Sequence, residues 1–201
     1  MTEFKTHLKP TKHFCNIENM QGYGIYQNIR NSSWHCLIDY DITALPIDVL
    51  KIARNAGFHV IKNSSVNILL DGENGRSYYD GNRWYIIYDD RNTTEVSRFT
   101  VAHELGHIFL GHELKHIKYS HTQQIEATSK SEIQADRFAI KLLCPACVLW
   151  KYELYSPEDI SRACRVDMDV ATKRADRMKI LIKRNCFLKS PLEQELYNKF
   201  F

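Results

Sequence analysis

The feature that most constrains the fold is the pentapeptide His-Glu-Leu-Gly-His at residues 103–107. On an α-helix, residues four apart lie one turn apart on the same face, so the two imidazoles point the same way. Such a pair can bind one Zn²⁺ ion, while the carboxylate of Glu104 handles a proton. Chance produces this pattern in about 2% of chains of similar composition, so the surrounding sequence must support it.

The residues around the pentapeptide predict the helix that the motif requires. Asn92 is the predicted N-cap, with Glu95 three residues later as its capping-box partner. From residue 96 to residue 110, apolar residues recur at helical spacing, and His103 and His107 fall in the same stripe. We therefore expect the two imidazoles to face the interior.

Upstream of this helix the pattern changes to short elements. Pro46 is expected in the first turn of a helix that ends at Gly57. The runs that follow predict a small antiparallel sheet. The predicted elements are a helix over residues 44–56, strands over 58–62 and 66–70, and a hairpin formed by 77–79 and 83–88.

Downstream, proline and capping residues mark the predicted ends of helices. One helix should stop before Pro145, and Ser156 followed by Pro157 is a strong helix start. The predicted elements are a polar loop over 114–130, a helix over 131–143, a short helix from Pro157 to about Cys164, and a last helix capped by Asp167 or Asp169 and reaching about Arg184.

A catalytic zinc site needs a third protein ligand and an open position for water. His112 follows His107 by five residues, which is about 500° of helical rotation and turns it off the ligand face. The metzincin spacing fails, because Leu110 and Glu113 stand where that subclass needs glycine and histidine. His112 remains an alternative ligand.

Glu132 is the preferred third ligand. It opens the helix over 131–143 and shares a face with Ala135, Asp136 and Ala139. The two alanines are small, so this helix could approach the histidine-bearing helix closely. Asp136, one turn on, could accept the free N–H of a ligand imidazole and fix its tautomer. The alternative is that Glu132 is a helix-start carboxylate favoured by the dipole and Asp136 a surface charge.

Composition limits the class of protein. The chain has 201 residues, of which 44% are apolar and 25% charged, and its net charge of +3 does not mark a nucleic-acid binder. No apolar run approaches the roughly 18 residues that span a bilayer. The N-terminus lacks an apolar signal segment, so we expect a cytoplasmic protein without a membrane partner. Its six cysteines are then expected to be reduced, and Cys144 and Cys147 are expected to be packing thiols.

Two segments carry a resemblance to a known family. The first is Phe-Thr-Val-Ala-His-Glu-Leu-Gly-His-Ile-Phe-Leu-Gly-His at residues 99–112, and the second is Glu-Ile-Gln-Ala-Asp-Arg-Phe-Ala-Ile-Lys-Leu-Leu at 132–143. Together they resemble the ImmA/IrrE family of zinc metallopeptidases. The resemblance covers about residues 44–184, and Cys144 stands where members often carry methionine.

The resemblance implies an α+β fold in which a small antiparallel sheet packs on zinc-bearing helices, followed by a helical C-terminal segment. It implies a gluzincin-like zinc endopeptidase with His103, His107 and Glu132 as ligands and Glu104 as general base. Family members are associated with cleaving or disabling helix-turn-helix repressors, so an anti-repressor acting on a repressor encoded nearby is expected. The expected parts are an N-terminal extension (1–42), a metallopeptidase core (43–153) and a C-terminal helical segment (154–201).

A competing hypothesis comes from the basic C-terminal helix. Between residues 173 and 189 its only acid is Asp176, and with the helix from Pro157 it resembles a helix-turn-helix pair. Lys173, Arg174 and Arg177 could then contact DNA, and the protein would be a regulator with a structural or sensory zinc site. A solvated basic face over a packing unit is the simpler explanation. The oligomeric state does not follow from the sequence.

Overall fold

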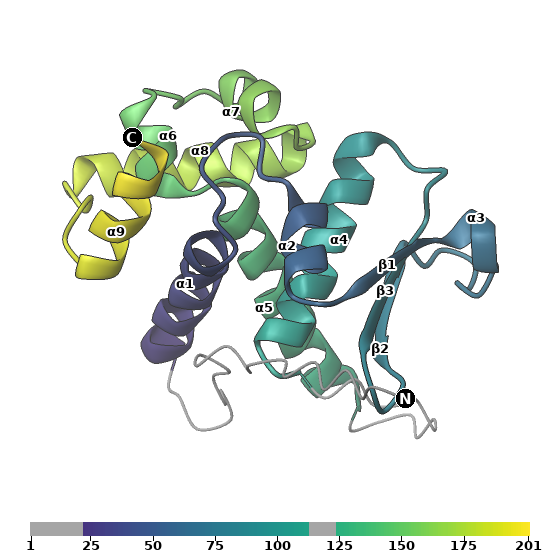
Figure 1. Ribbon diagram of the computed structural model, residues 1–201. Helices are drawn as coiled ribbons and strands as arrows, with labels where there is room; N and C mark the ends of the chain where they lie inside the picture. The colour runs from purple at the N-terminus through teal and green to yellow at the C-terminus, as the bar shows by residue number, and fades with distance from the viewer. Residues whose placement is uncertain (1–21, 113–123) are drawn as a thin grey trace.

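A computed structural model describes residues 22–112 and 124–201, with side chains described from residues 27 and 130 onward in these two parts. Two central helices lie between a small sheet on one side and the first helix and the C-terminal helices on the other (Figure 1), and the expected α+β class is confirmed. The described elements are α1 (Gly22–Asp39), α2 (Val49–Asn55), β1 (His59–Lys62), α3 (Asn63–Val66), β2 (Gly75–Tyr79), β3 (Trp84–Tyr88), α4 (Thr94–Phe109), α5 (Gln124–Leu143), α6 (Ala146–Lys151), α7 (Pro157–Cys164), α8 (Met168–Lys183) and α9 (Pro191–Phe200).

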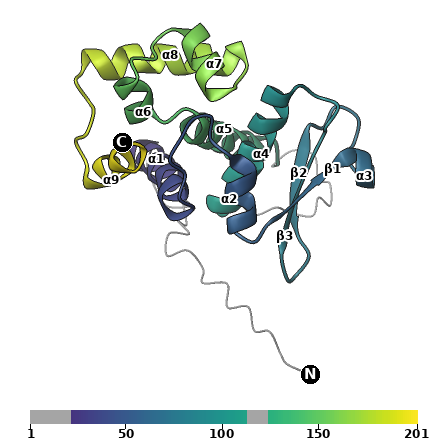
Figure 2. The same cartoon turned by 45° about the horizontal axis from the view of Figure 1, so that its top comes forward.

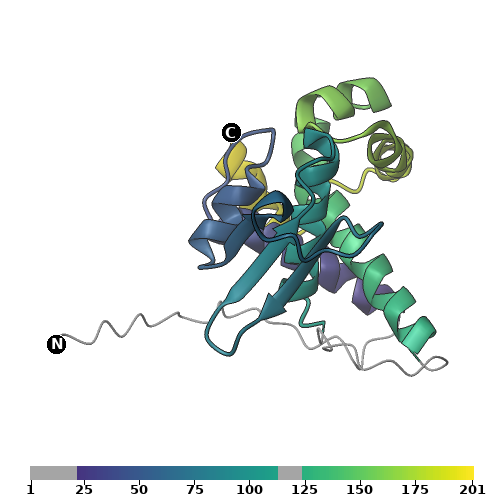
Figure 3. The same cartoon turned by 90° about the vertical axis from the view of Figure 1, so that its right-hand side faces the viewer.

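The sheet has three strands among the described residues, in the order β1-β3-β2. Figure 3 views the molecule from the side on which this sheet lies. β2 and β3 form the predicted antiparallel hairpin, with Ser77 opposite Ile86. β1 pairs with β3 in parallel, with Val60 opposite Ile86, so the prediction of a purely antiparallel sheet is wrong. The reason is the connection over 63–74, which carries the chain past β3 to the far edge, so that β3 returns in the direction of β1.

The predicted strand over 66–70 is also wrong. After the single turn of α3, Asn67 adopts a left-handed conformation with φ of 50°. The side-chain oxygen of Asn63 then accepts hydrogen bonds from the backbone N–H groups of Ile68 and Leu69, at 3.0 and 3.1 Å. These bonds occupy donors that a strand would offer to a neighbour, and the segment becomes a loop on the surface.

The predicted starts of two helices shift by a few residues. α2 begins at Val49, because the Asp48 side chain caps it by accepting a hydrogen bond from Lys51 N–H at 2.9 Å. Pro46 therefore precedes the helix, although Gly57 follows its end as predicted, with φ of 77°. α4 is capped by the Thr93 hydroxyl, one residue after the predicted cap at Asn92.

α5 is longer than predicted. It begins at Gln124, so the prediction of a loop is wrong for residues 124–130, whereas residues 113–123 lie outside the described part. It ends at Leu143 ahead of Pro145, as predicted.

Close approach of the two central helices depends on Gly106 of α4. A Cβ there would lie 3.1 Å from the Cα of Ala135 and 3.2 Å from its carbonyl oxygen, both on α5. Because glycine and alanine meet at this point, the backbones of α4 and α5 come close enough for side chains on one helix to reach those on the other.

α1 belongs to the hydrophobic core. Its side chains Ile29, Trp34 and Leu37 are buried among those of α4, α5 and the C-terminal helices. The helix packs along α5 and beside α9 (Figure 2). Of the expected extension over 1–42, residues 22–39 thus form a core helix, and residues 1–21 lie outside the described part. The three-part division of the chain remains a prediction.

The C-terminal elements follow their predicted boundaries. Ser156 caps α7 and Asp167 caps α8, each by accepting a backbone hydrogen bond from the third residue on. α9 was not predicted, and it closes the core through Leu196 and Phe200. Cys144 directly after α5, Cys147 on α6 and Cys164 on α7 are free and buried, and burial raises the pKa of Cys147 to about 12. Cys15 lies outside the described residues.

Candidate metal centre

α4 presents the two histidines of the pentapeptide to α5. His107 is buried, and the side chain of His103 is 15% exposed. Residues four apart on one helix place their imidazoles side by side, and here the two Nε2 atoms lie 2.9 Å apart. The predicted common face of the two histidines is therefore present.

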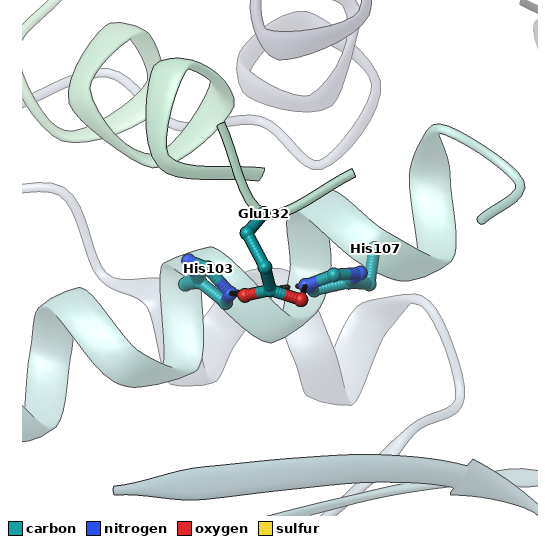
Figure 4. Close-up of side chains that lie close together, drawn as sticks. All are labelled: His103, His107 and Glu132. Carbon is teal, nitrogen blue, oxygen red and sulfur yellow. Dashed lines mark hydrogen bonds and ion pairs between the residues drawn. The ribbon is translucent and has the colours of Figure 1, made fainter. Parts of the chain in front are cut away.

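α5 brings the carboxylate of Glu132 between the two imidazoles (Figure 4). Its Oε2 lies 3.0 Å from Nε2 of His103, and its Oε1 lies 3.3 Å from Nε2 of His107. The three possible ligand atoms lie within 4.8 Å of one another. The structure thus gathers the three predicted ligands from two helices that are separated in the sequence by residues 110–123.

This donor set suits a divalent cation. In a tetrahedral zinc site with bonds of about 2.0–2.1 Å, neighbouring ligand atoms lie about 3.3 Å apart. The Nε2 and Oε atoms of the cluster are already at 2.9 to 3.3 Å, so only small side-chain movements would admit an ion. Two imidazoles and one carboxylate are also the ligand types of known catalytic zinc sites.

The carboxylates and imidazoles of the cluster shift one another's pKa values. Hydrogen bonds to His103 and His107 hold the pKa of Glu132 well below its usual range. Burial alone would lower the pKa of His103, but hydrogen bonds to Asp136 and Glu132 raise it to about 9. The carboxylates therefore favour positive charge at this point, which a proton or a metal ion can supply.

Asp136 lies where the sequence predicted it. Its Oδ1 is 2.8 Å from Nδ1 of His103, the ring nitrogen opposite the one that faces Glu132. The carboxylate is about half exposed. An acceptor at Nδ1 holds the imidazole in the tautomer whose Nε2 lone pair can face a metal.

Glu104 points from α4 towards β2. It is buried, and its Oε2 accepts a hydrogen bond of 2.6 Å from the hydroxyl of Ser77. Gly75, two residues before Ser77, allows this approach, because a Cβ there would lie 2.3 Å from Cγ2 of Thr100 on α4. Ser77 was not among the predicted site residues, although the spacing of Gly75 and Ser77 puts both on one strand face.

His112 is not a member of the ligand cluster. Its Nδ1 lies 3.1 Å from Nδ1 of His107, on the far side of that ring from Glu132, and its Nε2 lies 2.8 Å from Oε1 of Gln134. Burial lowers the pKa of His112, so its ring is neutral near pH 7. The alternative that His112 is the third ligand is not supported by this geometry.

The three basic residues singled out on α8 have different environments. Lys173 is exposed and pairs with Asp169 one turn earlier, whereas Arg177 is half-buried. Arg174 is buried. Desolvation lowers the pKa of Lys141 on α5 to about 7, and the positive charge of the nearby Arg174 adds to this effect. As a surface contact for DNA, the prediction for Arg174 is therefore wrong.

Two helices that bring the pentapeptide and a carboxylate as third ligand together beside a small sheet define a candidate metallopeptidase. A family model described as the IrrE N-terminal-like domain, a peptidase M78 family, matches residues 53–176. The chain belongs to this family, and the resemblance drawn from its residues is confirmed. Membership supports a metallopeptidase that uses a metal ion and acts on a protein substrate.

No curated protein matches the chain by sequence. No helix in the described ranges is long and apolar enough to cross a membrane.

Proposed function

We propose that the protein is a zinc-dependent endopeptidase in which His103, His107 and Glu132 hold the ion and Glu104 is the general base. The observation that carries this proposal is the convergence of the three ligand atoms within 4.8 Å. The buried Glu104 stands next to the first ligand on the same helix. A structural zinc site would need a fourth protein ligand and no adjacent base.

Zinc bound by these residues would polarise the scissile carbonyl and make a water molecule more acidic. Glu104 would take the proton from the attacking water and pass it to the leaving amine. The Ser77 hydroxyl binds one of its carboxylate oxygens, so the other, Oε1, would transfer the proton. Asp136 would keep His103 in the tautomer that binds metal through Nε2.

The substrate that we propose is a helix-turn-helix repressor encoded near this protein, which gives the enzyme an anti-repressor role in the cytoplasm. The support for this substrate is the family resemblance at residues 99–112 and 132–143. The test is to incubate the purified protein with the repressor of the neighbouring locus, with and without a chelator. We expect cleavage that the chelator abolishes and zinc restores. Cleavage that persists in chelator would reject the metallopeptidase mechanism.

A DNA-binding regulator with a structural or sensory metal is the second candidate. Its support is the pair α7 and α8, joined by residues 165–167, together with exposed cations on α8 such as Lys173 and Lys179. Both lysines pair with acids on the same helix, Asp169 and Asp176, which weakens their attraction for phosphates. A salt-dependent gel shift on DNA, unchanged in the Glu104→Gln variant, would favour this candidate.

A further inference from the structure

The two histidines of the cluster differ in what binds their second ring nitrogen. Nδ1 of His103 faces the carboxylate of Asp136 at 2.8 Å. Nδ1 of His107 faces another imidazole nitrogen, Nδ1 of His112, at 3.1 Å. Two nitrogens at this distance form a hydrogen bond only if one of them carries the proton and the other does not. One of the two ring nitrogens is therefore the donor and the other the acceptor, and the groups that contact the two rings determine which is which.

His112 reaches this position because the chain turns back after α4. Leu110 is the C-cap of the helix, and Gly111 follows with φ of 69°. The N–H of His112 then donates to the carbonyl of His107 at 3.0 Å. A Cβ on Gly111 would meet no atom within 4 Å, so glycine is favoured here for its conformation and not for lack of space.

The contact between Gln134 and His112 determines which ring nitrogens donate and which accept. Oε1 of Gln134 can only accept, so Nε2 of His112, 2.8 Å away, carries a proton. In a neutral ring Nδ1 of His112 is then an acceptor, and Nδ1 of His107 must donate to it. This leaves the lone pair of Nε2 of His107 directed towards Glu132.

We propose that His112 and Gln134 are positioning residues that select the tautomer and orientation in which His107 binds metal. Gln134 lies on α5, two residues after Glu132. The same helix therefore supplies one ligand directly and orients another through His112. The inference rests on the proposed function in one respect, which is that His107 is a metal ligand. It needs neither the identity of the substrate nor the role of Glu104.

The first test measures the dissociation constant for zinc by competition with a chromophoric chelator. We expect His112→Phe to bind zinc about 10–100-fold more weakly, as is usual for lost partners of metal-bound histidines. His112→Asn should recover most of the affinity, because its Oδ1 can accept in place of Nδ1. Thermal unfolding of each metal-free variant checks that the fold is retained.

Gln134 provides a variant that does not touch His107. Gln134→Leu removes the acceptor for Nε2 of His112 and should weaken zinc binding, whereas Gln134→Glu offers a stronger acceptor and should tighten it. Ile133→Ala, an exposed neighbour on α5, is the matched control and should leave the affinity unchanged. Equal affinities for the wild type, His112→Phe and Gln134→Leu would overturn the inference.

A second measurement reads the tautomers directly. In the zinc-loaded protein, long-range ¹H–¹⁵N NMR should find the proton of His112 on Nε2 and that of His107 on Nδ1. A proton on Nδ1 of His112 would contradict the inference even if zinc binds. If the wild-type protein binds no zinc, the metal centre itself fails and the inference with it. If zinc binds but the repressor is not cleaved, only the substrate assignment fails.

Discussion

The two helices that form the candidate centre hold their side chains in different ways. On α4, Glu104 and His107 are buried and their polar atoms have partners from β2 and from the turn after the helix. On α5, Glu132 and Asp136 are about half exposed, and among the described residues their side chains bond to the histidines. Packing therefore orders the α4 side, whereas the α5 side depends on charge and on whatever occupies the centre.

The largest expected effect is on the α4 side. Glu104→Gln keeps the shape of the buried side chain but removes the base, so repressor cleavage should fall by about 10³-fold or more. Zinc content after dialysis should not change, because Glu104 is not a ligand. Glu95→Gln, on the first turn of the same helix, is the control and should cleave normally. Unchanged proteolysis in Glu104→Gln would sink the proposed mechanism.

The second largest effect should come from removing the ligand that α5 supplies. Glu132→Ala removes a ligand from an exposed position, so zinc affinity should fall by more than about 100-fold, beyond what loss of a hydrogen-bond partner causes. Stability of the metal-free protein should change little, since the side chain is half exposed. Arg137→Ala on α5 is the control for both measurements. Full zinc retention in Glu132→Ala would reject Glu132 as a ligand.

A smaller effect is expected where β2 supports α4. Ser77→Ala leaves a buried carboxylate oxygen without its 2.6 Å hydrogen bond, which costs about 1.5–3 kcal/mol for a charged acceptor. We expect kcat to fall by about tenfold or more with KM unchanged, and urea unfolding to show lower stability. Ser65→Ala, at an exposed position, should have no effect. A change confined to KM would argue that Ser77 contacts substrate instead.

The smallest effect should come from the exposed partner of His103. Asp136→Asn keeps an oxygen that can accept from Nδ1 but loses the charge, and the site is about half exposed. Zinc affinity should therefore fall by about tenfold, the lower end of the range for such partners. Loss of zinc as complete as in Glu132→Ala would mean that Asp136 is itself a ligand.

Local signals account for the parts of the fold that were predicted correctly. The hairpin of β2 and β3 follows from a turn between two β-rich runs, and α7 and α8 follow from the capping side chains of Ser156 and Asp167. The errors involve contacts between distant residues. β1 pairs in parallel because of a long connection, and α1 is a core helix whose period is masked by polar residues such as Asn28 and Asn31.

The sequence by itself determined that two imidazoles and a carboxylate share one turn of a helix, since spacing along a helix is a local property. It also singled out Glu132 and Asp136, because their helix carries small residues on the same face. Only the tertiary structure decided that Glu104 meets Ser77 and that His112 meets Gln134. Those contacts join atoms brought together by the close packing of α4 with β2 and α5, which spacing along a single chain segment does not encode.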